Sequence, residues 1–381
     1  MTKRVFVALS GGVDSSVAAA LLKERGFDVA GIHMKMWSQQ DSRQQLAASP
    51  QPEAVCQQQF QDRHDAMRVA AKLDIPFQTW DFTAEYRRAV VDYMIREYAA
   101  GRTPNPDVMC NRHIKFGLFL RRALAAGADF VATGHYVRLK VREQGMGNRE
   151  QDDLSPITCH LYASVDANKD QSYFLWTLTQ EQLRHCLFPI GECTKPEVRV
   201  MARKFGLPTA DKPDSQGVCF IGEFDMREFL ARHIPERRGR VLTTAGRVVG
   251  EHSGVEFYTI GQRQGIGIGG GVPYYVAGKD PATNTLTVAE GPYDGELFRR
   301  ELVARNINWI SGRPPAGGFP LRCEARIRYR QPLQPCWLKK LPATSYTLQA
   351  VFDSPQRAVT PGQSVAFYQG DELLGGGIIM R

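Results

Sequence analysis

The segment 9–16, LSGGVDSS, constrains this chain more than any other part of it. It follows an apolar run, Val5 to Leu9, typical of a buried parallel strand, and it opens a segment of helical spacing, Val17 to Arg25, that Gly26 closes. A strand that turns through Ser-Gly-Gly into a helix leaves unpaired backbone N–H groups and hydroxyls at one point, an arrangement that binds phosphate oxygens. The sequence therefore predicts a nucleotide site here.

An ordinary tight turn, in which Ser10 or Asp14 only caps the helix, is the alternative to a nucleotide site. The chain contains no GxxxxGK(S/T) motif, which disfavours a Walker-type γ-phosphate transferase. A GxGxxG match at 265–270 is soon followed by Pro273, so no helix can start there. We expect a flexible glycine-rich loop at that position rather than a dinucleotide site.

The length of 381 residues predicts two or three domains. In the first third, strand-like runs alternate with segments of helical spacing, which predicts an α/β fold with a doubly wound parallel sheet and a ligand at the carboxyl ends of its strands. The predicted strands are 5–9, 29–34, 77–82 and 130–133, and the predicted helices are 15–25, 60–73, 84–99 and 112–126.

Three domains are expected: a catalytic domain over 1–178, to whose site 208–222 returns, a helical module over 179–236, and a β-rich region of barrel type over 237–381. In the second, helices are predicted over 195–205 and 224–233. In the third, strands are predicted over 255–260, 285–289, 322–328 and 364–368. Two polar segments, 38–52 and 143–158, are typical of exposed insertions.

The formal charge of +8 and the pI near 9.1 suit a polyanionic partner, with nucleic acid the leading candidate. No apolar run approaches the roughly 18 residues of a membrane helix, and the first strand leaves no room for a signal peptide, so we expect a cytoplasmic protein. The eight cysteines form no CxxC pair or zinc-spaced cluster. A special cysteine here is therefore more typical of a nucleophile than of a metal ligand, and no metal site is assigned.

Two cysteines stand in loops that suit chemistry. Cys110 lies in a proline-bearing loop ahead of a helix expected to begin near His113, where neighbouring basic side chains should lower the pKa of its thiol. Cys219 is flanked by glycines that allow a backbone to approach closely. Taken alone, each would be more typical of a buried structural cysteine.

An ordered set of motifs makes the chain resemble the bacterial tRNA-specific 2-thiouridylases, a family of PP-loop ATP pyrophosphatases. The motifs lie at 10–15, 101–107, 110, 133–136, 168–174, 217–222, 261–263, 328–331 and 361–363, and so cover nearly the whole chain. The resemblance implies ATP-dependent adenylation of the C2 oxygen of the wobble uridine in tRNA. Sulfur transfer from a cysteine persulfide would follow, giving 2-thiouridine, AMP and pyrophosphate.

The resemblance also implies roles for single residues. Cys219 would carry the persulfide, Cys110 would complete the exchange through a Cys110–Cys219 disulfide, and Asp107 is a candidate acid or base. ATP, with Mg²⁺, would be held by Ala8, Leu9, Ser10, Gly11, Gly12, Val13, Asp14, Ser15, Met34 and Gly134. The flipped target base would meet Asn105, Pro106 and Asp107. The tRNA would be contacted by His135, Lys169, Asp170, Gln171, Arg328, Tyr329 and Gln363.

The expected partners are tRNAs for lysine, glutamate and glutamine, and a sulfur-relay protein or cysteine desulfurase that donates the persulfide. Two alternatives remain open. Another PP-loop adenylating enzyme, such as an amide or amidine synthetase, would need no paired cysteines. A non-catalytic RNA-binding protein would have no use for a PP-loop.

Overall fold

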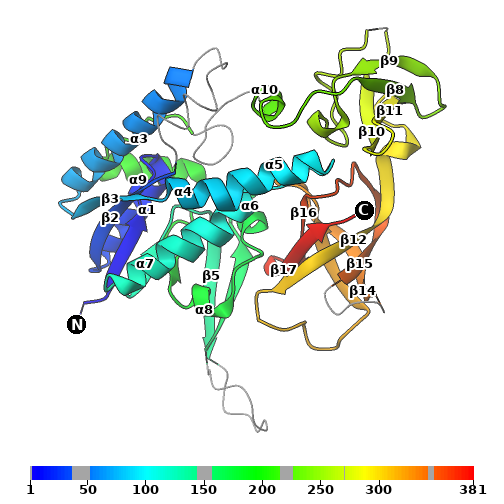
Figure 1. Cartoon of the computed structure of the whole chain (residues 1–381). Helices are drawn as coiled ribbons and strands as arrows, with labels where there is room; N and C mark the ends of the chain where they lie inside the picture. Colours follow the sequence, from blue (N-terminus) through cyan, green and yellow to red (C-terminus); the bar gives the residue numbers. More distant parts are fainter. Residues whose placement is uncertain (1, 37–51, 144–156, 215–225, 270, 342–346) are drawn as a thin grey trace.

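A computed structural model of the chain describes residues 2–36, 52–143, 157–214, 226–269, 271–341 and 347–381. Figure 1 shows an α/β part, blue to green, beside two β parts formed by the later chain. Among the described residues, no helix has both the length and the apolarity needed to cross a membrane.

The α/β part is built on a five-stranded sheet in the order β3-β2-β1-β4-β7, with every neighbouring pair parallel. Its strands are β1 (Arg4–Ala8), β2 (Asp28–Lys35), β3 (Phe77–Asp81), β4 (Phe130–Ala132) and β7 (Cys186–Leu187). The first four confirm the predicted strands, whereas β7 was not predicted, because two residues are too few to show a pattern. The strand order reverses between β1 and β4, where sheets of this kind bind ligands.

Helices cover both faces of the sheet, as a doubly wound fold requires. Val5 and Val7 of β1 face a core shared with α1 (Val13–Glu24), α3 (Pro52–Lys72) and α9 (Lys195–Lys204). Phe6 and Ala8 alternate with them and face the opposite core. Two helical segments cover that second face: α4 (Thr83–Tyr86), η1 (Arg87–Val91) and α5 (Asp92–Ala99) in one, and α6 (Pro106–Met109), η2 (Cys110–Phe119) and α7 (Leu120–Ala125) in the other.

The first β part is a four-stranded sheet in the order β10-β11-β8-β9. Its strands are β8 (Gly239–Thr243), β9 (Val248–His252), β10 (Tyr274–Asp280) and β11 (Thr285–Glu290). The predicted strand over 255–260 is wrong. Val255 and Phe257 are both buried in a short 3₁₀ turn, η4 (Val255–Phe257), so their alternation reflects packing against the core. Residues 265–269 form neither helix nor strand, which agrees with the expected glycine-rich loop.

The second β part is a six-stranded closed barrel in the order β12-β15-β14-β13-β16-β17, with β17 paired back to β12. Its strands are β12 (Phe298–Trp309), β13 (Leu321–Arg326), β14 (Gln334–Lys340), β15 (Thr347–Arg357), β16 (Ser364–Gln369) and β17 (Glu372–Ile379). β17 also pairs with β6 (Ile157–Ala163), the partner of β5 (Val137–Glu143). A hairpin of the α/β part therefore extends the barrel wall.

Short elements complete the description: η3 (Ser172–Phe174), α8 (Gln180–Leu183), α10 (Met226–Ala231) and η5 (Gly295–Leu297). The predicted helices over 195–205 and 224–233 correspond to α9 and α10. Of the two predicted insertions, 38–51 and 144–156 lie outside the described residues, while α3 begins at Pro52.

Candidate active site

The turn between β1 and α1 depends on glycine. Gly11 has φ +81°, and a Cβ atom at this position would lie 2.1 Å from the carbonyl oxygen of Asp62. The N-cap of α1 is Gly12, which has no side-chain cap hydrogen bond. Ser15 Oγ donates to the carbonyl oxygen of Gly12 and accepts from the backbone N–H of Ser10, both at 3.2 Å. Neither Ser10 nor Asp14 is the N-cap residue of the helix, so the capping role that the alternative gave them is wrong.

The loop after β4 lies directly against the first turn of α1. A Cβ atom on Gly134 would lie 2.6 Å from the backbone nitrogen of Ser15 and 2.7 Å from the carbonyl carbon of Asp14. Only glycine permits this approach. The structure thus brings Gly134 to the turn, at the carboxyl edge of β1 and β4, and places Met34 in the neighbouring strand β2.

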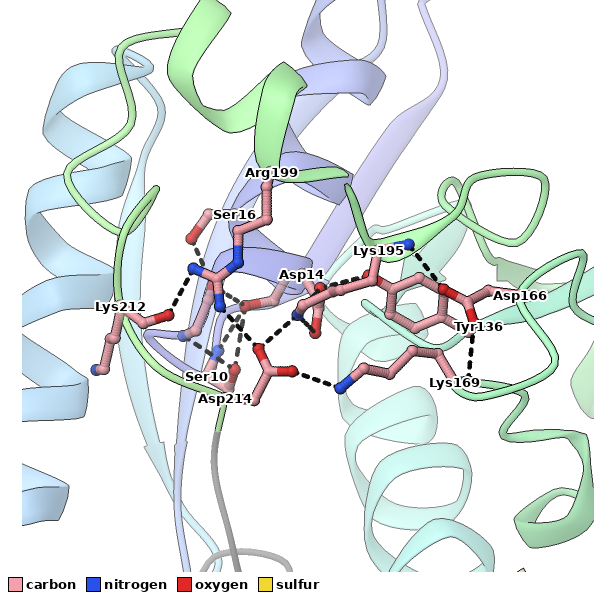
Figure 2. Close-up of polar contacts among 12 residues, drawn as sticks. Ser10, Asp14, Ser16, Tyr136, Asp166, Lys169, Lys195, Arg199, Lys212 and Asp214 are labelled. Carbon is pink, nitrogen blue, oxygen red and sulfur yellow. Dashed lines mark hydrogen bonds and ion pairs between the residues drawn. The ribbon is translucent and has the colours of Figure 1, made fainter. Parts of the chain in front are cut away.

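Asp14 is the centre of a polar cluster that Figure 2 shows. Its Oδ1 accepts from Tyr136 Oη at 2.7 Å, and its two oxygens lie 2.7 and 2.9 Å from Lys195 Nζ. The backbone N–H of Lys195, at the start of α9, donates to Asp166 at 2.8 Å. Burial and then the charge of Asp14 raise the pKa of Tyr136, so its hydroxyl stays a donor to that carboxylate.

Three cations converge on the carboxylate of Asp214 (Figure 2). Lys169 Nζ donates to Oδ2, while Lys195 and Arg199 lie 2.8 and 2.9 Å from Oδ1. Burial works against the ionised form, but Lys169 and Lys195 outweigh it and lower the pKa of Asp214 to about 2. The group is therefore a permanent anion at neutral pH, beside the turn of α1.

Lys212 ties the turn to α3. Its Nζ donates to the carbonyl oxygen of Gly11 at 3.0 Å and to Asp62 and Asp65 at 2.7 Å each. Burial opposes its charge, but the hydrogen bonds to the two acids outweigh it and raise the pKa of Lys212. This lysine is fully paired within the protein.

Lys195, Arg199 and Lys212 belong to the site but were not predicted from the sequence. The sequence did contain a signal for Lys195 and Arg199. They are four residues apart in the predicted helix 195–205, so their two basic side chains lie on the same face of that helix. Nothing local marks Lys212, whose partners lie about 150 residues away in the chain.

Cys110 lies inside a helix rather than in a loop ahead of one. The helix begins at Pro106, and Asn105 caps it by accepting a hydrogen bond from the backbone N–H of Val108 at 3.3 Å. Asn at the N-cap and Pro at the first helical position were the overlooked signals. Cys110 is thus the fifth helical residue, and its side chain is buried.

Asn111, the next residue, is 2% exposed, and its Nδ2 donates to the carbonyl oxygen of Phe174 at 3.4 Å. Its buried Oδ1 has no hydrogen-bond partner among the described residues. An unpaired buried oxygen is costly, so this atom is available to a ligand.

Cys219 lies in 215–225, outside the described residues, so its role and its pairing with Cys110 stay predictions. None of Cys110, Cys159, Cys186, Cys193, Cys323 and Cys336 forms a disulfide bond within the described part of the chain.

His135, predicted to contact tRNA, is buried beside two aromatic rings. Its ring centroid lies 5.7 Å from that of Phe116 and 6.3 Å from that of Phe188, and Nδ1 is 2.7 Å from Thr133 Oγ1. Burial and then the charge of Lys115 hold the pKa of His135 well below its usual value. The imidazole is therefore neutral at pH 7.

The other predicted tRNA residues join parts of the protein to one another. Arg328 Nη2 donates to the carbonyl oxygens of Ile260 and Ala358, at 3.1 and 2.8 Å. Gln363 Nε2 donates to those of Thr103 and Pro104, at 3.1 and 2.8 Å, just ahead of the predicted base-binding residues. The remaining contacts are Lys169 to Asp214, Asp170 to Arg326, Gln171 to the backbone of Tyr136, and Tyr329 to the ring of Phe174. Their contact with tRNA stays a prediction.

A doubly wound sheet with a glycine turn at its switch point, followed by a small β sheet and a closed barrel, defines an α/β HUP-type protein with two appended β domains. Residues 3–223 match the family described as tRNA methyl transferase HUP domain. Residues 227–290 match the tRNA methyl transferase PRC-barrel domain, and residues 299–379 match the aminomethyltransferase beta-barrel domain.

Relatives match over almost the entire chain. The tRNA-specific 2-thiouridylase MnmA of Thiobacillus denitrificans is 49% identical over 100% of both chains. The protein of the same name from Geobacillus thermodenitrificans is 47% identical over 99% of this chain and 94% of that relative. Among solved structures, the U34-tRNA thiolase NcsA from Methanococcus maripaludis is similar at 15% identity and a TM-score of 0.33, covering 61% of this chain and 68% of that one. The chain belongs to the tRNA-specific 2-thiouridylase family.

Proposed function

We propose that the chain is an ATP-dependent tRNA-uridine 2-sulfurtransferase, which replaces the C2 oxygen of a wobble uridine with sulfur and releases AMP and pyrophosphate. The observation that carries this proposal is 47–49% identity, over at least 99% of the chain, to relatives named tRNA-specific 2-thiouridylase. The expected substrates are tRNAs for lysine, glutamate and glutamine. A sulfur-relay protein or a cysteine desulfurase would supply the persulfide.

The turn of α1 fits a nucleotide. Gly11 and Gly134 leave no room for a Cβ atom, so at these two positions the backbone itself borders the turn at the carboxyl edge of the sheet. Residues 8–15, Met34 and Gly134 would hold ATP, with Mg²⁺ accompanying its phosphates. ATP supplies the activation that makes the uracil C2 oxygen a leaving group.

The helix that begins at Pro106 would contact the target base and supply Cys110 for the sulfur transfer. Asn105, Pro106 and Asp107 would meet the flipped uracil, Asp107 as the acid or base, and the unpaired Oδ1 of Asn111 is a further acceptor nearby in sequence. The terminal sulfur of a Cys219 persulfide would bond to C2 as the C2–O bond breaks. The Cys110 thiolate would then attack Cys219 Sγ, which leaves the terminal sulfur on C2 and a Cys110–Cys219 disulfide.

The matching family description speaks of methyl transfer, and another adenylating enzyme was an alternative from sequence. Neither methyl transfer nor the other adenylation reaction needs two cysteines. Activity measurements on cysteine variants therefore distinguish both from sulfur transfer. Cys219→Ser should accept no persulfide and form no 2-thiouridine, whereas Cys110→Ser should load a persulfide on Cys219 and stall. Labelled persulfide trapping and mass spectrometry of tRNA nucleosides measure both steps.

Cys193→Ser is the matched control, because this partly exposed cysteine follows β7 and belongs to none of the predicted motifs. It should thiolate tRNA at the wild-type rate. Full thiolation by both the Cys110 and the Cys219 variants would exclude the proposed sulfur route.

A further inference from the structure

The carboxylate of Asp214 occupies a position suited to a stronger anion. Lys195 bridges it to Asp14, with Nζ 2.7 Å from Asp14 Oδ1 and 2.8 Å from Asp214 Oδ1. Lys195 therefore connects Asp214 to the first turn of α1, which contains Asp14. The helix dipole also favours negative charge at this turn. Figure 2 shows Lys169, Lys195 and Arg199 pointing at this one carboxylate.

Lys169, Lys195 and Arg199 carry three positive charges against the two carboxylates of Asp14 and Asp214, so the cluster has one net positive charge. A phosphate chain carries more negative charge and more acceptor oxygens than a carboxylate, so the same cations can bind it with more hydrogen bonds. The side chain of Asp214 is 28% exposed. An incoming anion can therefore reach these cations without unfolding the surrounding structure.

Lys212 lies two residues before Asp214, yet its pairing differs from that of the three cations. Two carboxylates and the carbonyl oxygen of Gly11 use all three of its N–H donors. It fixes the turn, whereas Lys169 has Asp214 as its only ion-pair partner among the described residues.

We propose that Lys169, Lys195 and Arg199 bind the phosphate chain of ATP, and that Asp214 is an internal anion which the phosphates displace. The inference rests on the proposed nucleotide site and adds that the Asp214 carboxylate competes with the phosphates of ATP for these cations. In the absence of nucleotide, Asp214 holds the three cations in place. Its return to them after the reaction favours the departure of pyrophosphate.

Asp214→Asn tests this exchange because it removes the competing charge and keeps the shape of the side chain. Calorimetry at fixed ionic strength should show that inorganic pyrophosphate and ATP with Mg²⁺ bind about three- to tenfold tighter to the variant. Stopped-flow release of pyrophosphate should slow by a similar factor.

Asp211→Asn is the matched control. It makes the same change of charge three residues away, on an 80% exposed side chain that pairs with Arg203. Its affinities should equal those of the wild type. Unchanged or weaker binding by Asp214→Asn, at a retained melting temperature, would overturn the exchange, because Asp214 would then be structural or would assist binding.

A second variant decides the matter if Asp214→Asn does not fold. Lys169→Gln should bind pyrophosphate about three- to tenfold more weakly than the wild type, and unchanged affinity would overturn the proposal. The calorimetric measurements on both variants omit tRNA, so they do not depend on thiolation. A wild-type protein that bound neither ATP nor pyrophosphate would remove the nucleotide site and the exchange together, whereas normal binding with unaltered variants would remove only the exchange.

Discussion

Gly134 has no side chain, yet it determines how closely the loop after β4 approaches the first turn of α1. Gly11 likewise allows a close approach on the other side of the turn, because the backbone of Asp62 leaves no space for a Cβ atom there. Gly11 belongs to a motif that can be recognised from its neighbours in sequence. Gly134 could be predicted only through the family resemblance, because its constraint comes from residues about 120 positions earlier.

Gly134→Ala should therefore separate the loop from the helix. The new Cβ atom would lie 2.6 Å from Ser15 N, and since backbone atoms cannot rotate aside, α1 or the loop must shift. We expect ATP affinity to fall at least about tenfold and the unfolding free energy to fall by about 1–3 kcal/mol, as measured by calorimetry and chemical denaturation. Gly295→Ala, where nothing lies within 4 Å, is the control. Wild-type ATP affinity in Gly134→Ala would contradict the assigned role of the turn.

Among the elements, the sequence predicted best those that rely on local patterns. Strands β1, β2 and β4 are mainly apolar and mainly buried, as runs next to turn residues predict, whereas β3 buries only Trp80. The edge strand β7 was missed because it consists of two residues. The start of the helix that carries Cys110 was placed too late, because the segment with Pro104 and Pro106 was interpreted as a loop although Asn105 caps a helix there.

The turn before β16 contacts a segment of the α/β part that lies about 260 residues earlier in the chain. A Cβ atom on Gly362 would lie 2.8 Å from the carbonyl oxygen of Thr103, and Thr103 N–H donates to the carbonyl oxygen of Pro361. Gln363 completes this contact with its two hydrogen bonds to the 103–104 backbone. The barrel thereby holds the segment that leads into Asn105, which no local pattern could reveal.

Gln363→Leu should loosen this segment and leave two carbonyl oxygens without their side-chain donor. We expect a loss of about 1–3 kcal/mol in unfolding free energy, slower tRNA thiolation and unchanged ATP affinity. Gln349→Leu, which removes an exposed hydrogen bond to Glu301, is the matched control. If Gln363 acted only by touching tRNA, stability would remain at the wild-type value and tRNA affinity alone would fall.

For the whole molecule, the barrel and the α/β part share a packed interface. The side chain of Trp176 is fully buried, and Asn308 Nδ2 donates to the carbonyl oxygens of Trp176 and Leu178, at 2.7 and 2.9 Å. Tyr173 Oη donates to the carbonyl oxygen of Ser364 at 2.8 Å. Composition changes along the chain suggested three successive domains, a division that stays a prediction. They could not show these contacts, because the partners are more than 100 residues apart.

Gly376→Ala tests whether this interface couples the two parts. A Cβ atom at Gly376 would lie 2.7 Å from Trp176 Cγ and 2.5 Å from the carbonyl oxygen of Val365, so the indole and strand β16 cannot both keep their places. We expect the unfolding free energy to fall by about 1–3 kcal/mol, in one transition that tryptophan fluorescence and circular dichroism report together. Gly269→Ala, with open space around its Cβ position, should leave the transition unchanged. Two separate transitions in Gly376→Ala, with ATP binding retained after the first, would show instead that the α/β part is stable without the barrel.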